Sequence, residues 1–294
     1  MSCLIKFSQD YVRRRDLSKG YQHQILCTVR AFGRSMSKEP TVSDLSAQSI
    51  NHLISVKSVS GETRNNRRRM LLTLAAEAAR MGLIERIDPF FVQKIKRRKK
   101  LPKGYSIDQA RQIIRAIAKP PKREKWFQFV YENGVRRRDW WLAYLLACWD
   151  SGAVQDMRLL TRDQIEPDGS YWFLRHKTGK VVDGRLSRPT LAAIKRIDRP
   201  RQRLLFPRWC NCKNGKCISE EFRVIAEVSE CPGTLKYFRS GAGTNVEKNN
   251  PQSGHQFLSN SRRVFEENYL VRSHLKGREV ISPEPLLEEL EGIE

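Results

Sequence analysis

The residues of this chain best suited to chemistry lie between 234 and 269, where cations, an amide and a tyrosine recur at short intervals. Lys236 and Arg239 are three residues apart and would share one face of a helix. Asn260 opens a further polar-then-apolar segment, and Tyr269 follows it by nine residues. A tyrosine that attacks a phosphodiester needs a proton donor for the leaving group, cations for the negative oxygens and a route for the phenolic proton. The segment offers the tyrosine and two cations.

The spacing of these residues resembles the second half of the active site of the tyrosine recombinase (phage integrase) family. The usual pattern there is His-x-x-Arg, then Leu-Gly-His, then a nucleophilic Tyr nine residues after that His. This chain has Lys236-Tyr-Phe-Arg239, Leu258-Ser259-Asn260 and Tyr269 in the same frame. The resemblance implies that Tyr269 forms a covalent 3′-phosphotyrosyl intermediate and that Arg239 is one of two arginines that clamp the scissile phosphate. It also implies that no metal, ATP or other cofactor is needed.

Two positions in this frame depart from the usual histidines. Lys236 can donate to a phosphate oxygen, but it cannot act as a base unless its pKa is strongly lowered. Asn260 can donate a hydrogen bond but cannot shuttle a proton. His255 lies five residues before Asn260, where the family begins the helix preceding Leu-Gly-His. It is either part of the site or a structural histidine.

A β-hairpin is predicted further upstream. Two apolar segments, 171–174 and 181–182, flank the sequence Lys177-Thr-Gly-Lys180, and Asp168-Gly169 forms a turn before them. The family carries its general acid, a lysine, on such a hairpin turn. The resemblance therefore implies that Lys177 is the general acid, with Lys180 as the alternative.

The most serious departure concerns the first clamp arginine, which the family places in a Thr-Gly-Leu-Arg turn after an apolar helix. The corresponding turn here is Ser151-Gly152-Ala153-Val154, so Val154 stands at the arginine position. Arg158, one turn later, is a candidate replacement. Loss of a clamp donor costs on the order of 10²–10³ in rate, by analogy with oxyanion donors. Two hypotheses follow: a recombinase that cuts DNA through Tyr269, or a DNA-binding accessory protein on the same fold that has lost cleavage.

The elements that must position these residues are mostly helical. Apolar residues recur at helical spacing in segments near 21–32, 46–56 and 64–82, and Ser106-x-x-Gln109 is typical of a capping box that opens another helix. Further helices are predicted at 141–149, 189–198, 218–229, 233–248 and 261–268. The expected fold is mostly α with one small hairpin. It comprises a helical, SAM-like core-binding domain (1–87), a basic linker (88–104), a mixed α+β catalytic domain (105–282) and an acidic tail (283–294).

Net charge is the second strong feature of the sequence. The chain of 294 residues holds 55 Lys+Arg against 32 Asp+Glu, which gives a charge of +23. A field of this size attracts a polyanion, and double-stranded DNA is the expected partner, with self-association of the chain on DNA. Cations at a helix N-terminus oppose the macrodipole, so the arginines at 64–69 suggest a phosphate backbone as their partner. The expected DNA-binding residues are Arg64, Arg67, Arg68, Arg69, Lys96, Arg97, Arg98, Lys99 and Lys100.

Two further features of the sequence are the lack of a long apolar segment and a group of cysteines. No segment reaches about 18 consecutive apolar residues, and the start lacks the apolar core of a signal peptide, so we expect a cytoplasmic, nucleoid-associated protein without a membrane span. The chain has seven cysteines, which we expect to be reduced in that compartment. Cys210, Cys212 and Cys217, with Cys231, offer an alternative hypothesis of a zinc-binding module, although their spacing is unusual for one.

Overall fold

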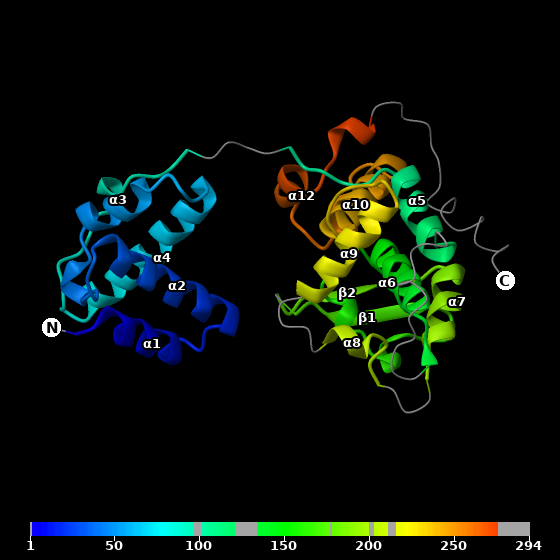
Figure 1. Cartoon of the computed structure of the whole chain (residues 1–294), viewed down its shortest axis with the longest axis horizontal. Coiled ribbons are helices and arrows are strands. Elements are labelled where there is room, and N and C mark those ends of the chain that lie inside the picture. Colours follow the sequence, from blue (N-terminus) through cyan, green and yellow to red (C-terminus); the bar gives the residue numbers. More distant parts are fainter. Residues whose placement is uncertain are drawn as a thin grey trace. The chain divides into compact units, whose positions relative to one another are not determined.

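The computed structural model describes residues 2–96, 101–120, 134–176, 178–199, 203–210 and 216–275. The chain divides into two compact units, Met1–Lys99 and Lys100–Glu294. The described residues are mainly helical, with a single two-stranded antiparallel sheet (Figure 1). This architecture confirms the fold class predicted from the sequence.

The first unit is helical throughout its regular structure. Its described helices are α1 (Leu4–Arg14), α2 (Lys19–Ser35), α3 (Ala47–Ser55) and α4 (Gly61–Arg80), with 3-10 turns η1 (Val42–Asp44) and η2 (Pro89–Phe91). The apolar stripe expected for the helix near 64–82 is buried in α4, where Met70, Leu71 and Leu74 face the core. Helix α1 was not predicted from the sequence, although Leu4 and Phe7 place a buried stripe at helical spacing there.

The basic segment after α4 is attached to this unit over its first half. The Asn65 side chain accepts from the Ile95 N–H (3.0 Å) and donates to the Ile95 carbonyl (2.7 Å). Asn51 makes the same kind of pair of bonds, to the Phe91 carbonyl at 2.9 Å and from the Gln93 N–H at 2.7 Å. Residues 91–95 therefore pack on α3 and α4.

The second unit holds more elements. In chain order these are α5 (Ile107–Ala118), α6 (Arg137–Ser151), η5 (Met157–Leu159), η6 (Arg162–Gln164), β1 (Ser170–Leu174), β2 (Val181–Arg185), α7 (Arg188–Ile197), α8 (Pro207–Cys210), α9 (Lys216–Val228), α10 (Lys236–Asn249), α11 (Gly254–Phe257), α12 (Arg262–Asn268) and η8 (Arg272–Leu275). The predicted capping box opens α5: the Ser106 hydroxyl accepts from the Gln109 N–H, and the Gln109 side chain accepts from the Ser106 N–H.

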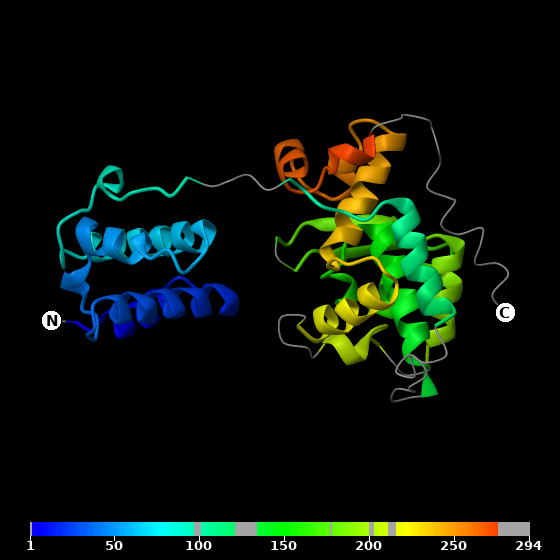
Figure 2. The same cartoon turned by 45° about the horizontal axis from the view of Figure 1, so that its top comes forward.

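Helix α6 is the centre of the second unit. It is apolar on nearly all sides, as expected of a helix that is buried all round. It packs against α5, α7, α10 and β2, and these elements surround it in both views (Figures 1 and 2). Trp141 lies against Trp209 of α8 with ring centroids 4.7 Å apart, and its indole N–H donates to Glu221 of α9 at 3.1 Å. This aromatic core fixes the platform on which the C-terminal helices rest.

The hairpin confirms the predicted strand pair. Strands β1 and β2 are antiparallel, with Ser170 opposite Arg185 and Leu174 opposite Val181. Tyr171 and Phe173 point into the core, while Trp172 and Leu174 are exposed, in the alternation expected of a strand with one buried face. Arg175 continues this alternation and is buried. The Arg175 N–H donates to the Lys180 carbonyl at 2.8 Å and closes the turn.

Helix α10 is seated unusually closely on the start of α5. Gly241 faces the backbone of Tyr105, and a Cβ atom at Gly241 would lie well inside contact distance of the Tyr105 carbonyl oxygen. The Tyr105 N–H also donates to the Tyr237 carbonyl at 3.2 Å. The absence of a side chain at Gly241 therefore sets how deeply α10 sits in the unit.

Candidate active site

The predicted site residues converge from three C-terminal elements of the second unit. Lys236 and Arg239 lie on the first turn of α10, Asn260 lies between α11 and α12, and Tyr269 directly follows α12. Lys177 lies outside the described residues, while its neighbours Thr178 and Gly179 form the exposed hairpin turn. The structure thus brings the cations of α10 to the tyrosine that follows α12.

Tyr269 is a half-buried residue at the C-terminal cap of α12. Its N–H donates to the Phe265 carbonyl at 2.9 Å, and its own carbonyl accepts from the Thr244 hydroxyl of α10 at 3.2 Å. Its ring faces two cations: the Lys236 Nζ and the Arg239 Cζ each lie 5.1 Å from the ring centroid. Distances of this size are typical of cation–π contacts.

Arg239 is held by two backbone carbonyls. Its Nη1 donates to the Gly152 carbonyl, and its Nη2 donates to the Leu258 carbonyl at 2.7 Å. Burial and the nearby positive charge of Arg175 lower the pKa of Arg239, while Tyr269 and Asp156 act in the opposite direction. A guanidinium fixed in this way keeps its remaining N–H groups aimed in one direction, which suits recognition of an oxyanion.

Gly152 is the point where the end of α6 meets the site. It adopts a left-handed conformation (φ +59°), and a Cβ there would lie 2.5 Å from the Leu258 side chain. Both the backbone angle and the close approach require glycine at this position. Its carbonyl is thereby presented to Arg239.

Glu247 of α10 holds the segment that leads to Tyr269. This buried carboxylate (7% exposed) accepts from the Gln252 N–H at 3.1 Å, the Gly254 N–H at 3.0 Å and Arg262 Nη1 of α12 at 2.7 Å. Burial by itself raises the pKa of Glu247, but these hydrogen bonds outweigh it and bring the pKa below its ordinary value. The sequence reasoning missed Glu247, since a lone Glu within a helix carries no motif.

Two buried side-chain nitrogen atoms lie on α11 and in the turn that follows it, without a hydrogen-bond partner among the described residues. These atoms are the Asn260 Nδ2 and the His255 Nδ1. The Asn260 N–H donates to the His255 carbonyl at 2.9 Å, and Ser259 between them has a positive φ of 49°. The Leu258 carbonyl, which accepts from Arg239, thus lies two residues before Asn260 in this turn.

Val154 is a core residue, and Arg158 is a half-buried residue beside the core. Val154 is 5% exposed, and its carbonyl accepts from the Tyr144 hydroxyl at 2.5 Å. Arg158 donates Nη1 to the Trp209 carbonyl at 3.5 Å, and its charge acts on the buried Tyr144. Arg158 thus contacts the aromatic core around α6 through the Trp209 carbonyl.

A different arginine, missed by the sequence reasoning, lies at the site. Arg175 follows β1, and its Nη1 donates to the Leu258 carbonyl at 2.9 Å, the same oxygen that accepts from Arg239. Asp156 is its nearby carboxylate, with 3.7 Å between Asp156 Oδ2 and Arg175 Nε. The signal was present in the sequence, because Arg175 is the third member of the inward alternation begun by Tyr171 and Phe173.

The arginines of α4 serve more than one purpose. Arg68 donates to the Val92 and Pro89 carbonyls (3.0 and 2.8 Å), and Arg64 donates to the Ile54 carbonyl at 3.3 Å. Arg64 and Arg68 thus have hydrogen-bond partners within the protein, so a phosphate backbone is not needed to explain where these two arginines lie. Arg69 and Lys96 are exposed, Arg67 is half-buried, and Arg97, Arg98, Lys99 and Lys100 lie outside the described residues.

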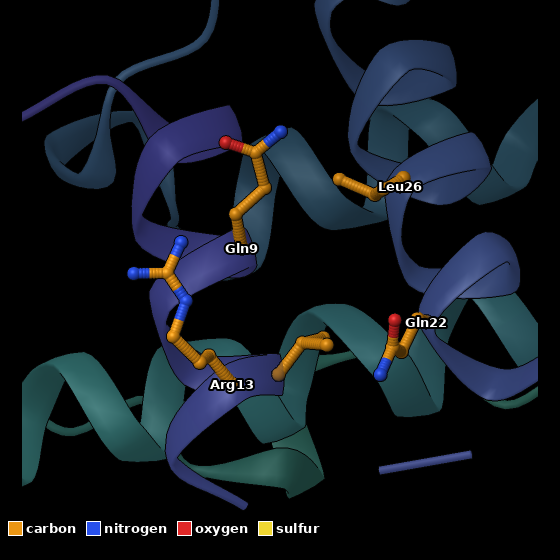
Figure 3. A pocket seen from close by; sticks show the side chains of 5 residues that line it. Gln9, Arg13, Gln22 and Leu26 are labelled. Atoms are coloured by element: carbon orange, nitrogen blue, oxygen red, sulfur yellow. The ribbon is translucent and has the colours of Figure 1, made fainter. Parts of the chain in front are cut away.

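A cavity of about 400 Å³ opens in the first unit between α1 and α2. It is lined by Gln9, Val12, Arg13, Gln22 and Leu26 (Figure 3). None of the residues predicted for phosphoryl chemistry lies in it. The candidate site is instead a surface of the second unit around Arg239 and Tyr269.

The cysteine cluster does not form a described metal site. Within the described ranges, no group of three His, Cys, Asp or Glu residues is arranged to hold a metal ion. Cys217 is disulfide-bonded, so the expectation of reduced cysteines is wrong at this position. Cys231 is a buried free thiol, and Cys212 lies outside the described residues. Separately, no described helix has both the length and the apolar character needed to cross a membrane.

The fold is that of the tyrosine recombinases. A lambda integrase dimer bound to a COC′ core site matches this chain with a TM-score of 0.66 at 14% identity, covering 87% of this chain and 94% of that chain. A lambda integrase tetramer bound to a Holliday junction gives 0.65 at 15% identity, covering 86% and 75%. The Tn1549 transposon integrase in complex with a circular intermediate DNA gives 0.63 at 13% identity, covering 92% and 95%. No family model and no curated protein matches the sequence.

Proposed function

We propose that this chain is a DNA-binding tyrosine recombinase that cuts and rejoins double-stranded DNA through a 3′-phosphotyrosyl intermediate on Tyr269. The observation that carries the proposal is the position of Tyr269, whose ring lies 5.1 Å from both Lys236 and Arg239. These residues come from separate elements, at the spacing that suggested the function in the sequence. A phosphate bound by the two cations would lie within reach of the phenol.

The proposed reaction is an in-line displacement that requires no cofactor. The Tyr269 oxygen attacks phosphorus and releases its proton to solvent, and the 5′-oxygen leaves with a proton supplied by a general acid. Arg239 stabilises the non-bridging oxygens, where negative charge develops. We assign the general acid to Lys177, and supporting hydrogen bonds to Lys236 and Asn260. Rejoining reverses the displacement with a new 5′-hydroxyl.

DNA binding is proposed from charge and exposure. The chain carries a net charge of +23, and Arg69 and Lys96 of the first unit are exposed. The similar structures are bound to DNA as a dimer and a tetramer. We propose the same kind of self-association on DNA for this chain, in a cytoplasmic, nucleoid-associated setting. Binding should weaken steeply with salt as neutralised phosphates release counterions.

Covalent capture tests the proposal. Wild type, Tyr269→Phe and Tyr237→Phe are incubated with pools of nicked double-stranded DNA, and denaturant-resistant protein–DNA adducts are isolated and sequenced. Tyr237 is the matched control, because it is a half-buried tyrosine on α10 whose ring packs on Tyr105. We expect adducts from wild type and Tyr237→Phe and none from Tyr269→Phe. Adducts that persist in Tyr269→Phe would contradict the assignment of the nucleophile.

The second candidate function is a DNA-binding protein on this fold that does not cut. The observation that favours it is Val154, a buried apolar residue where the resemblance expects a clamp arginine. This candidate predicts salt-sensitive DNA binding with no adduct from wild type on any pool. Capture of a wild-type adduct excludes it.

A further inference from the structure

The proposed site has one feature that its assigned residues do not explain, namely a second buried guanidinium. Arg175 is only 8% exposed, and it follows β1 at the base of the hairpin turn. Its Nη1 and the Nη2 of Arg239 donate to the same Leu258 carbonyl at 2.9 and 2.7 Å. Because both nitrogens donate to one oxygen atom, the two guanidinium groups lie close together.

The hydrogen-bonding capacity of Arg175 is incompletely used. Its Nη2 is buried without a hydrogen-bond partner among the described residues. Its Nε is also without a hydrogen bond there, although Asp156 lies within ion-pair distance at 3.7 Å. A buried donor without an acceptor is costly, so such a group in a native fold calls for a partner that binds there.

Among the residues that the structure describes, the charges at this place are also unbalanced. Arg175 and Arg239 are two cations, and Asp156 is the carboxylate that acts on both. Asp156 is itself engaged by the His176 N–H at 3.1 Å. The pKa of Arg239 is lowered by burial and then by the charge of Arg175, which is the direction expected when two like charges are held together. An anion between the two guanidiniums would relieve both the repulsion and the missing hydrogen bonds.

We infer that Arg175 is the second arginine of the phosphate clamp and takes the place that the sequence leaves empty at Val154. This inference rests on the proposed function and names the residue that completes its site. Arg175 reaches the phosphate from the hairpin side, and Arg239 reaches it from α10. When the Tyr269 oxygen bonds to phosphorus and the bond to the 5′-oxygen breaks, the two guanidiniums share the charge of the non-bridging oxygens. No further reactant is needed.

The competing explanation is that Arg175 is purely structural and holds the Leu258 carbonyl against the hairpin. The two explanations differ in whether charge on the substrate matters. A methylphosphonate at the scissile position has one negative oxygen fewer than a phosphate, so it has less need of a clamp cation. A clamp variant should therefore recover on this substrate, whereas a variant with a damaged fold should not.

The experiment measures single-turnover adduct formation by the full chain on the DNA sequence captured with wild type. The variants are Arg175→Gln, Arg175→Lys and the control Arg185→Gln. Arg185 is an exposed arginine of the same hairpin (70% side-chain exposure), and its Nε donates to the Asp168 carbonyl at 2.9 Å. On phosphate DNA we expect Arg175→Gln to be slower by on the order of 10²-fold, with Arg175→Lys intermediate and Arg185→Gln within about twofold.

On methylphosphonate DNA we expect the difference between wild type and Arg175→Gln to shrink at least tenfold. Equal rates for Arg175→Gln and Arg185→Gln on phosphate DNA would overturn the inference. So would an unchanged difference between wild type and Arg175→Gln on methylphosphonate DNA. DNA binding, measured for each variant, should stay within a few-fold of wild type.

A second measurement does not depend on cleavage and separates the two proposals. Inorganic phosphate is titrated while the unfolding midpoint of the second unit is followed by tryptophan fluorescence. We expect phosphate to raise the midpoint of wild type and Arg185→Gln more than that of Arg175→Gln. If phosphate gives these shifts but no protein–DNA adduct is captured, the proposed DNA cleavage is wrong and Arg175 is still an anion-binding residue. Equal shifts in all three proteins would overturn the inference even if cutting is observed.

Discussion

Glu247 allows a quantitative test of how the chain holds Tyr269 in place. The perturbation is Glu247→Ala, compared with Glu247→Gln. In the folded chain, Oε1 accepts from the Gln252 N–H and from Arg262, and Oε2 accepts from the Gly254 N–H. Because Arg262 belongs to α12, loss of the carboxylate releases the helix that ends at Tyr269.

The magnitude follows from the partners that are left behind. The buried Gly254 N–H loses its acceptor, which costs about 1–3 kcal/mol. Arg262 is 40% exposed and retains Glu266 at 2.6 Å, so its lost ion pair adds only about 1 kcal/mol. We expect Glu247→Ala to lower the free energy of unfolding by about 2–4 kcal/mol. Glu247→Gln should cost less, because its amide oxygen can still accept from Gln252 and Arg262.

The stability that Glu247 contributes should depend on pH, in a direction that follows from the pKa of its carboxyl group. The pKa of Glu247 lies below its ordinary value of 4.5 in the folded chain, since hydrogen bonds favour the ionised form. The stability that this carboxylate contributes is therefore fully present above about pH 4.5 and is lost as the pH falls through the folded pKa. The difference between wild type and Glu247→Gln should be constant from pH 7 to about 5 and shrink below that.

Urea unfolding monitored by tryptophan fluorescence is the assay, because all six tryptophans lie after Lys100 and report only on the second unit. The matched control is Glu267→Ala, which removes an exposed carboxylate paired with the exposed Arg263 and should cost less than about 0.5 kcal/mol. The reasoning is refuted if Glu247→Ala is no more destabilising than this control. A difference between wild type and Glu247→Gln that does not change down to pH 3 would also refute it.

Two other predictions test neighbouring parts of the structure. Gly152→Ala should destabilise the second unit by about 2–4 kcal/mol in the same urea assay, because the new side chain would sit on a left-handed backbone and overpack against Leu258. A change below about 1 kcal/mol would contradict this geometry. Arg68→Ala should lower the thermal midpoint of the first unit, followed by circular dichroism, because it leaves the Val92 and Pro89 carbonyls without their donor. Arg69→Ala should leave that midpoint unchanged and reduce the salt dependence of DNA binding. Equal thermal midpoints for Arg68→Ala and Arg69→Ala would show that the division between structural and exposed arginines is wrong.

Much of the fold was predictable from the sequence because its elements follow local rules. The apolar stripe of α4, the capping box at Ser106 and the hairpin around 171–182 are each encoded by residues that are close in sequence. Helix α1 was missed, although Leu4 and Phe7 carry a helical stripe. The attachment of residues 91–95 to α3 and α4 depends on Asn51 and Asn65, which are distant in sequence and carry no local signal.

The site was predictable only where a spacing pattern marks it. Arg239 and Tyr269 lie together as their spacing suggested. Arg158 was the natural candidate for the missing cation, because it is nearest in sequence to Val154. Arg158 donates to the Trp209 carbonyl instead, and Arg175, 21 residues after Val154, donates to the Leu258 carbonyl that also accepts from Arg239. Only the closure of the hairpin onto the Leu258 turn brings Arg175 to Arg239, and no local rule encodes that contact.

The hydrogen bond from Thr244 to Tyr269 bears on which protomer of an assembly would supply the nucleophile for each strand cut. The Tyr269 carbonyl is bound by a side chain of α10, the same helix that carries Lys236 and Arg239 of the same chain. Under the proposed function, each protomer would supply its own nucleophile in cis, next to its own clamp. A protomer without the hydroxyl and a protomer without the clamp would then not complement each other in a mixed assembly, and every strand cut would belong to one intact copy.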